Sequence, residues 1–407
     1  MKATRFLAIL TAIIFAACEA DFAAMAPGDA GGENGDYELM DPDSSGGADG
    51  GEEDSNNGNS LAGVVTAGEW NDLENWGFWN ELMSGQNEGK FYEYLNYWSL
   101  YPSDRFAVTV VDKEGNPVCG AKVELFVNGA EKPSWTAISD NHGSAELWHN
   151  IHSSIDTDEE KTFTASVDGV KWSEPLKPTY NFSEQVNLNT LVAESVTTSR
   201  SADIAFIVDA TGSMLDEIDF LKDDLLNIIQ RASSSTSTEL RTGALFYRDE
   251  GDDYLTRIED FNKDPEKTLK FIKKQNANGG GDYPEAVHTA LEKALQDMSW
   301  GEGNYARIAF LLLDAPPHHQ QDVIESLQKS IKLYAAKGIK IIPIAASGVD
   351  KNTEFILRLM AIFTDGTYTF ITNHSGVGGD HLIPTVGEYQ VEQLNDLIVR
   401  LIQEYTE

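Results

Sequence analysis

The 407-residue chain carries 66 Asp and Glu residues against 30 Lys and Arg residues, which gives a formal net charge of −36. Nucleic-acid-binding proteins need a basic surface, so this balance excludes nucleic acid as the expected partner. The same charge argues against electrostatic attachment to acidic membrane surfaces. The sequence contains two cysteines, Cys18 and Cys119, which are too few for a disulfide framework.

The first residues have the composition of a bacterial secretion signal. Lys2 and Arg5 precede an apolar run at residues 6–17, which is short for a membrane span. Small residues stand immediately before Cys18, and this pattern resembles the lipobox of bacterial lipoproteins. The resemblance implies removal of residues 1–17, lipidation of Cys18 and anchoring in a membrane. A secretory signal with an incidental cysteine is the alternative.

Residues 18–62 are predicted to form an acidic, disordered tether. Residues 19–62 contain 12 Asp or Glu residues and no Lys or Arg, and Gly, Ser and Asn fill much of the rest. Such a composition cannot bury enough apolar surface to offset the entropy lost on ordering. Residues 41–52 superficially match a Ca²⁺-binding EF-hand loop, but no amphipathic helices flank them, so we interpret them as linker.

The next segment, residues 63–102, is rich in aromatic residues at helical spacing. We predict a pair of helices packed on the following domain. An aromatic platform that stacks on sugar rings is the alternative. The residues at this spacing are Trp70, Leu73, Trp76, Trp79, Phe91, Tyr94, Leu95 and Trp98.

Residues 103–195 read as short alternating strands separated by turns. The Gly-Ala-x-Val run at 120–123 and the Asp-x-x-Gly run at 140–143 resemble transthyretin-like, carboxypeptidase-regulatory-type β-sandwiches. The resemblance implies a spacer or binding module without catalytic residues. Cys119 precedes a strand and is expected to be a small buried side chain. Strands are expected at 106–111, 121–126 and 162–167.

Residues 200–407 alternate between predicted strands and helices, which indicates a doubly wound, Rossmann-like α/β domain. The apolar run at 306–313 is typical of a central parallel strand. Gly338 is a helix C-cap signal. Strands are expected at 204–208, 240–247, 254–261, 306–313, 340–345 and 367–371, and helices at 265–274, 284–298, 321–337, 353–363 and 391–405.

The most informative motif follows the first strand of this domain. Asp209, Thr211 and Ser213 lie on the turn after it, and Asp314 ends another buried strand. Ligands of such sheets bind at the carboxyl ends of the strands, and carboxylates with hydroxyls suit a hard cation such as Mg²⁺. The Asp-x-Thr-Gly-Ser pattern resembles the metal-ion-dependent adhesion site of the von Willebrand factor type A family. In that family, these four positions hold a metal that binds an acidic group of a partner.

The second loop of that site departs from the family pattern. Residues 279–286 align with the loop that normally supplies a Thr, and Asp282 is the nearest oxygen donor. A third carboxylate would neutralise Mg²⁺ further, so we expect firm metal binding with a weaker hold on acidic partners. The alternative roles are helix caps, Asp209 for the helix after the motif and Asp282 for a helix starting at Pro284. Ca²⁺ and Mn²⁺ remain alternatives to Mg²⁺.

Two further features flank the motif. The acidic loop at residues 248–253 is expected to be solvated rather than part of the site. His318 and His319 follow Asp314 closely, and we interpret them as surface histidines at a helix start rather than ligand contacts.

The parts together predict a lipid-anchored binding or adhesion protein on the outer membrane or cell surface of a bacterium. No nucleophile elbow, HExxH motif or P-loop is present, so we expect no enzyme activity. A metal with an open coordination position that acts on a substrate is the rival interpretation. A structural component of an envelope protein complex that uses the same metal site is the third.

Overall fold

The computed structural model describes residues 65–85, 90–152, 160–179, 189–193, 201–215, 218–219, 227–232, 234, 238–303, 305–375 and 379–406. These residues belong to one compact unit that spans residues 58–407. The signal sequence, Cys18, the acidic tether and the EF-hand-like stretch lie outside the described residues. No described helix is long and apolar enough to cross a membrane.

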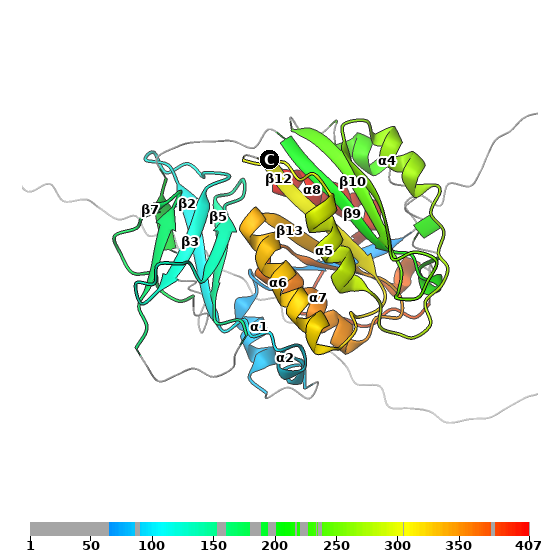
Figure 1. Ribbon diagram of the computed structural model, residues 1–407, viewed down its shortest axis with the longest axis horizontal. Helices are drawn as coiled ribbons and strands as arrows, with labels where there is room; N and C mark the ends of the chain where they lie inside the picture. The colour runs from blue at the N-terminus through cyan, green and yellow to red at the C-terminus, as the bar shows by residue number, and fades with distance from the viewer. Residues whose placement is uncertain are drawn as a thin grey trace, which may run out of the picture. The chain divides into compact units, whose positions relative to one another are not determined.

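An eight-stranded sheet forms the frame of the α/β domain (Figure 1). Its central strands run parallel to one another, and the strands at both edges run antiparallel to their neighbours. The order across the sheet is β11 (Thr256–Asn262), β10 (Glu239–Tyr247), β9 (Ser201–Asp209), β12 (Tyr305–Leu313), β13 (Ile339–Ala345), β14 (Tyr368–Ile371), β1 (Thr66–Trp70) and β15 (Val391–Gln393).

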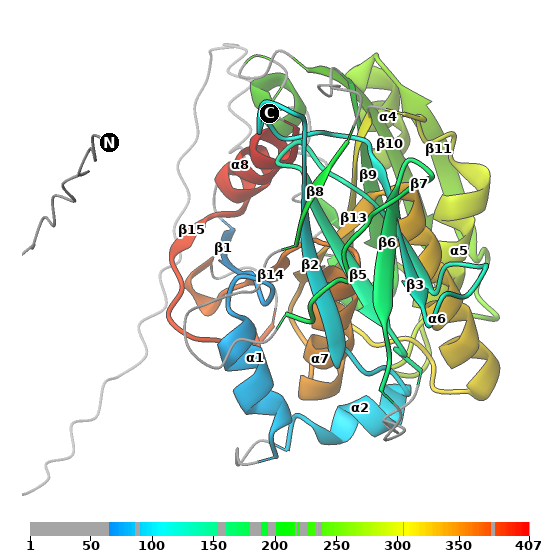
Figure 2. The same ribbon diagram turned by 90° about the vertical axis from the view of Figure 1, so that its left-hand side faces the viewer.

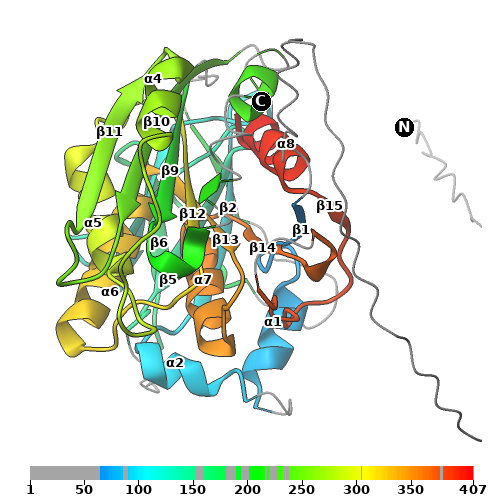
Figure 3. The same cartoon turned by 90° about the vertical axis from the view of Figure 1, so that its right-hand side faces the viewer.

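Helices cover both faces of this sheet, which explains why its central strands are almost continuously apolar. Along β9, Ala205 and Ile207 pack on the face under α5, α6 and α7, whereas Ile204 and Phe206 pack on the opposite face under α4 and α8. Figure 3 shows α8 on one side of the sheet and α5 and α6 on the other. The helices are α4 (Pro265–Ile272), α5 (Val287–Asp297), α6 (Gln321–Lys337), α7 (Lys351–Phe363) and α8 (Leu394–Thr406).

Two strands of this sheet were not predicted. Thr66–Trp70, expected within a helical segment, forms β1, and Val391–Gln393, expected as the start of the last helix, forms β15. β1 lies antiparallel between β14 and β15, with Ala67 opposite both Ile371 and Glu392. Gly68 permits this position, because a Cβ there would lie 2.7 Å from the Phe370 ring. Local periodicity missed β1 because its partners lie far away in the sequence.

The predicted helical pair is present. It packs on α7 of the α/β domain as well as on the domain expected to follow it, where the Trp76 and Trp148 rings lie 5.6 Å apart. α1 (Trp76–Met83) and α2 (Glu93–Trp98) appear beside α7 in Figure 2. The Trp79 and Phe91 rings lie 6.0 Å and 5.2 Å from the Phe355 ring of α7. Trp79 is 1% exposed, so it belongs to the core rather than to an open platform for sugars.

The described residues between 104 and 193, here called the β-module, form two smaller sheets that share one apolar core. Phe106 and Phe163 come from different sheets, and their rings lie 4.7 Å apart. One sheet has the order β5 (Ser144–His149), β2 (Asp104–Val111), β8 (Asn189–Val192). The other has the order β4 (Trp135–Ile138), β3 (Lys122–Val127), β6 (Phe163–Val167), β7 (Val170–Lys171).

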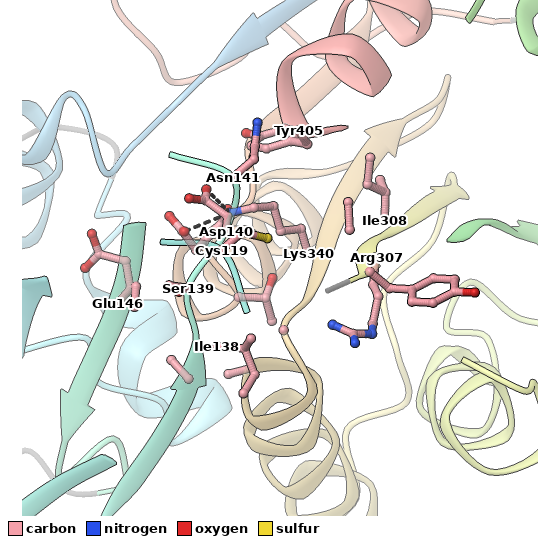
Figure 4. A pocket seen from close by; sticks show the side chains of 18 of the residues that line it. Cys119, Ile138, Ser139, Asp140, Asn141, Glu146, Arg307, Ile308, Lys340 and Tyr405 are labelled. Atoms are coloured by element: carbon pink, nitrogen blue, oxygen red, sulfur yellow. Dashed lines mark hydrogen bonds and ion pairs between the residues drawn. The ribbon is translucent and has the colours of Figure 1, made fainter. Parts of the chain in front are cut away.

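The β-module meets the α/β domain through an apolar contact and an ion-pair cluster. The Trp148 and Phe363 rings lie 5.1 Å apart. Lys340 of β13 lies 3.2 Å from the Asp140 carboxylate of the β-module and 2.7 Å from that of Asp365 (Figure 4). Cys119 lines a cavity of about 30 Å³ beside this cluster and is buried, as predicted.

Candidate metal centre

Strand order brings the two aspartates of the motif to the same edge of the sheet. β9 and β12 are parallel neighbours, with Val208 opposite Leu312, so Asp209 and Asp314 leave the sheet together. β10 flanks β9 on the other side and places Tyr247 opposite Asp209. The adjacency of β9 and β12 is what the resemblance to the von Willebrand factor type A family implied.

The first loop turns sharply around Asp209, which is fully buried. The backbone N–H and the hydroxyl of Thr211 both donate to Asp209 Oδ1, at 2.8 Å and 2.7 Å. The short helix that follows, Gly212–Met214, has Thr211 rather than Asp209 at its N-cap position. Asp209 is therefore not a helix cap, and its second oxygen, Oδ2, has no hydrogen-bond partner. Ser213 is exposed and lies close enough to Asp314 to lower the pKa of that carboxyl group.

The second loop places a different carboxylate in the interior from the one expected. Asp282 is exposed, whereas Glu285 is 4% exposed and was not predicted as a site residue. The Glu285 N–H donates to the Pro316 carbonyl at 2.9 Å, which ties this loop to the loop after β12. α5 starts at Val287, so the helix expected from Pro284 begins later and Asp282 does not cap it.

Gly280 brings this second loop close to the first. It adopts φ +74°, and a Cβ there would lie 3.0 Å from Glu285 Oε1 and 3.3 Å from Thr211 Cβ. The Gly212 N–H donates to the Gly279 carbonyl at 3.3 Å. The two loops are thus in direct contact, and a side chain at Gly280 would crowd both Glu285 and Thr211.

The buried carboxylates strongly disfavour their charged forms. Burial, with repulsion between neighbouring carboxylates, raises the pKa of Asp209 to about 7 and that of Glu285 to about 9. Burial also raises the pKa of Asp314, although the nearby Ser213 hydroxyl opposes that rise. The Tyr247 hydroxyl, buried beside Asp209, has a raised pKa for the same reason.

Several buried side-chain oxygens at this edge of the sheet have no hydrogen-bond partner. Asp209 Oδ2, Asp314 Oδ1, Glu285 Oε2 and the Tyr247 hydroxyl are buried without a hydrogen-bond partner. Buried polar atoms are normally satisfied, so several unsatisfied oxygens at one edge fit protons or a hard cation. Within the described ranges, no three His, Cys, Asp or Glu side chains are grouped closely enough to hold a metal by themselves. A cation here would therefore need the hydroxyls and water as well.

The neighbouring loop is more ordered than its acidic composition suggested. Arg248 and Asp249 are buried, while Glu250 and Asp253 are exposed, so only part of the loop is solvated. His318 Nε2 lies 2.6 Å from Asp249 Oδ1. His318 is thus engaged by a carboxylate at the edge of the site.

The histidine after it, His319, contacts α2. Its ring stacks on Tyr97 at 3.5 Å, and its Nε2 lies 2.7 Å from the Tyr97 carbonyl. His319 therefore joins α2 to the loop after β12.

Residues 203–376 match the family model of the von Willebrand factor A domain, so the chain contains such a domain. The chain is 31% identical over 129 residues to the putative ariadne-like RING finger protein R811 of Acanthamoeba polyphaga mimivirus, covering 32% of this chain and 12% of that protein. It is 28% identical over 131 residues to the alpha-protein kinase vwkA of Dictyostelium discoideum, covering 31% and 20%. The matches thus span only a small part of these relatives.

A solved structure, the conserved hypothetical protein BatB from Bacteroides thetaiotaomicron, matches 50% of this chain and 98% of its own length. Its TM-score is 0.35 and its sequence identity is 14%.

Proposed function

We propose that the von Willebrand factor A domain binds a divalent cation, Mg²⁺ in the first instance, and through it an acidic group of a partner protein. The observation that carries this proposal is the set of buried oxygens without hydrogen-bond partners on Asp209, Asp314 and Glu285. When bound, the cation supplies the positive charge that satisfies these oxygens and attracts a carboxylate.

The hydrogen bonds of the first loop suit the hydroxyls for direct contact with a cation. The Thr211 hydroxyl donates a hydrogen bond to Asp209 Oδ1. The lone pairs of the hydroxyl oxygen are therefore free to face a cation. The Ser213 hydroxyl is exposed and lies beside Asp314, so its oxygen is available to a cation at this edge. The third carboxylate, assigned to Asp282 from sequence, is reassigned to Glu285, and its added negative charge would weaken the hold on acidic partners.

The proposed activity is binding rather than catalysis. His318, which follows Asp314 closely in the sequence, is paired with the Asp249 carboxylate. That pairing supports a role in shaping the edge of the site.

Mg²⁺ titration of the full chain tests the reassignment of the third carboxylate. We expect Glu285→Gln to lower the affinity for Mg²⁺ at least about tenfold, because Gln cannot release a proton and supply the negative charge that the cation would stabilise. Asp282→Asn is the matched control and should stay within about twofold, because exposed charges interact weakly through water. Isothermal titration calorimetry measures both. Equal effects of the two substitutions would refute the reassignment, and no Mg²⁺ binding by the wild type would refute the proposed function.

We also propose that a lipid on Cys18 anchors the chain on the outer face of a bacterial envelope, with a transthyretin-like β-module as a spacer. The signal-like residues 1–17 and the acidic tether support the anchor. The turn at 140–143 supports the spacer, because it contacts the α/β domain through Asp140. Binding to external proteins or cells is the leading role, and assembly within an envelope complex is the alternative.

The Cys18→Ser variant should move the protein from the membrane fraction to the soluble fraction, because an acyl chain contributes the apolar surface that holds it in lipid. Cell fractionation followed by immunoblotting measures this shift. Cys119→Ser is the control and should leave the distribution unchanged. Retention of Cys18→Ser in the membrane fraction would contradict lipid anchoring.

A further inference from the structure

Arg248 occupies an unusual place beside the candidate metal centre. It follows Tyr247 at the end of β10, and its side chain is 6% exposed. Its guanidinium forms no ion pair with any other side chain that the structure describes. Instead, Nε donates to the Ala210 carbonyl at 3.1 Å, and Nη2 donates to the Asn276 carbonyl at 2.7 Å. A buried Arg that donates hydrogen bonds to two backbone carbonyls holds both backbone segments in place.

The two carbonyls lie in the first loop of the site and in the segment that leads into the second loop. Ala210 lies between Asp209 and Thr211 in the first loop. Asn276 lies in the segment that leads from α4 into the second loop, three residues before Gly279. One planar side chain therefore contacts both segments and holds them at a fixed separation.

Backbone contacts at the same place show how close the loops are. The Asn278 N–H donates to the Ala210 carbonyl at 3.0 Å, so this carbonyl receives both the Arg248 side chain and the second loop. Ala210 in turn donates its N–H to the Tyr247 carbonyl at 2.8 Å, which ties the first loop to β10. Ala210 is thus held from two sides, and a shift of Arg248 would be passed directly to Asp209 and Thr211.

Tyr254 holds the guanidinium in this orientation. The Arg248 guanidinium carbon lies 4.5 Å from the centre of the Tyr254 ring, and that of Arg257 lies 3.8 Å from it. The backbone N–H of Arg248 donates to the Leu255 carbonyl at 3.1 Å. Arg257 stacks on the same ring but donates to the Gln275 side chain, not to either loop carbonyl named above. Arg257 is therefore a natural comparison for Arg248.

We propose that Arg248 is a positioning residue that sets the spacing of the two loops and so makes the site prefer Mg²⁺ over Ca²⁺. This inference rests on the proposed metal-binding function. Mg²⁺ demands short, regular contacts of about 2.0–2.1 Å, whereas Ca²⁺ tolerates longer and more irregular ones of about 2.3–2.6 Å. A site whose loops are no longer held at a fixed separation loses Mg²⁺ affinity before it loses Ca²⁺ affinity.

The test compares Arg248→Lys with Arg257→Lys in the full chain. Both substitutions keep the positive charge and can keep the contact with Tyr254, but Lys cannot span two carbonyls with a planar fork. Isothermal titration with Mg²⁺ and with Ca²⁺ gives the ratio of the two affinities, which a general loss of stability would not change. We expect Arg248→Lys to shift this ratio toward Ca²⁺ by about tenfold and Arg257→Lys to leave it within about twofold.

The outcomes separate the two proposals. No binding of either cation by the wild type overturns the metal-binding function itself. Wild-type binding with an unchanged ratio in Arg248→Lys leaves that function standing and overturns the role of Arg248. An equal shift of the affinity ratio in Arg257→Lys also overturns the role of Arg248. The effect would then come from the stacking on Tyr254, which both arginines share. If Arg248→Lys fails to fold by circular dichroism, Arg248→Gln, which keeps one donor group, replaces it in the same comparison.

Discussion

In the presence of chelator at about pH 8, the Asp209→Asn variant is expected to be more stable than the wild type, by about 3 kcal/mol. The same variant should gain no stability from Mg²⁺, which should stabilise the wild type by binding only its folded state. Asn keeps an oxygen that accepts from Thr211 but removes the buried charge. A side chain that costs stability in the metal-free protein and is needed for its stabilisation by metal is the signature of a ligand site.

The pH dependence follows from the direction of the pKa shift. Burial raises the pKa of Asp209 from its ordinary 3.8 to about 7. The stabilising contribution of the protonated group is therefore fully present below about pH 4 and is lost as the pH rises through 7. Glu285, whose pKa is raised to about 9, extends this loss to higher pH. Without metal, the melting temperature of the wild type should fall more steeply over this window than that of Asp209→Asn.

Thermal unfolding followed by circular dichroism, with chelator and with Mg²⁺ across this pH range, measures both effects. Asp282→Asn serves as the control, because Asp282 is exposed. A variant that is less stable than the wild type in chelator at high pH would contradict the buried-charge argument. Continued stabilisation by Mg²⁺ in Asp209→Asn would place the cation elsewhere.

Asp72→Ala is expected to destabilise the protein by about 3–5 kcal/mol, because it leaves a buried cation without its main partner. The Arg358 side chain is 0% exposed and that of Asp72 is 2% exposed. Arg358 Nε donates to Asp72 Oδ2 at 2.8 Å, and Nη1 donates to the Thr385 carbonyl at 2.6 Å. The pair joins the segment after β1 to α7.

Urea unfolding of the single variants and of Asp72→Ala with Arg358→Met measures this coupling. The double variant should lose less stability than the sum of the two single losses, because both charges of the pair are removed together. Glu354, which also contacts Arg358, keeps its ion pair with Lys351 at 2.8 Å. Glu69→Ala is the matched control, because Glu69 of β1 pairs with Arg400, whose side chain is 43% exposed. That substitution should cost less than about 1 kcal/mol. If Asp72→Ala cost no more stability than Glu69→Ala, the buried-pair argument would be contradicted.

The central strands and long helices could be predicted from sequence because burial leaves a local signal. β12 is apolar throughout residues 308–313, and α6 ends at Lys337 with Gly338 at φ 63° as its C-cap, where the C-cap signal placed it. β1 could not be predicted in this way. Its five residues carry little periodicity, and they form a strand because β14 and β15 flank them in the folded chain.

The candidate site could also be predicted only in part. Asp209 and Asp314 follow buried strands, so topology alone places them at one edge. Asp282 and Glu285 are carboxylates three positions apart in one loop, and sequence does not show which of them faces inward. The hydrogen bond from the Glu285 backbone N–H to the Pro316 carbonyl fixes Glu285 as the inward-facing carboxylate. That contact exists only once β12 and α5 are packed.

The position of β1 also has a consequence for the order of folding during synthesis. The Thr66 and Thr372 hydroxyls lie 2.7 Å apart although 306 positions separate them. A ribosome therefore releases β1 early, and the strand waits unpaired until nearly the whole polypeptide exists. The described β-module strands pair within residues 104–192 and can assemble well before that. Because such non-local pairing is slow, closure of the large sheet should be the last event on the pathway.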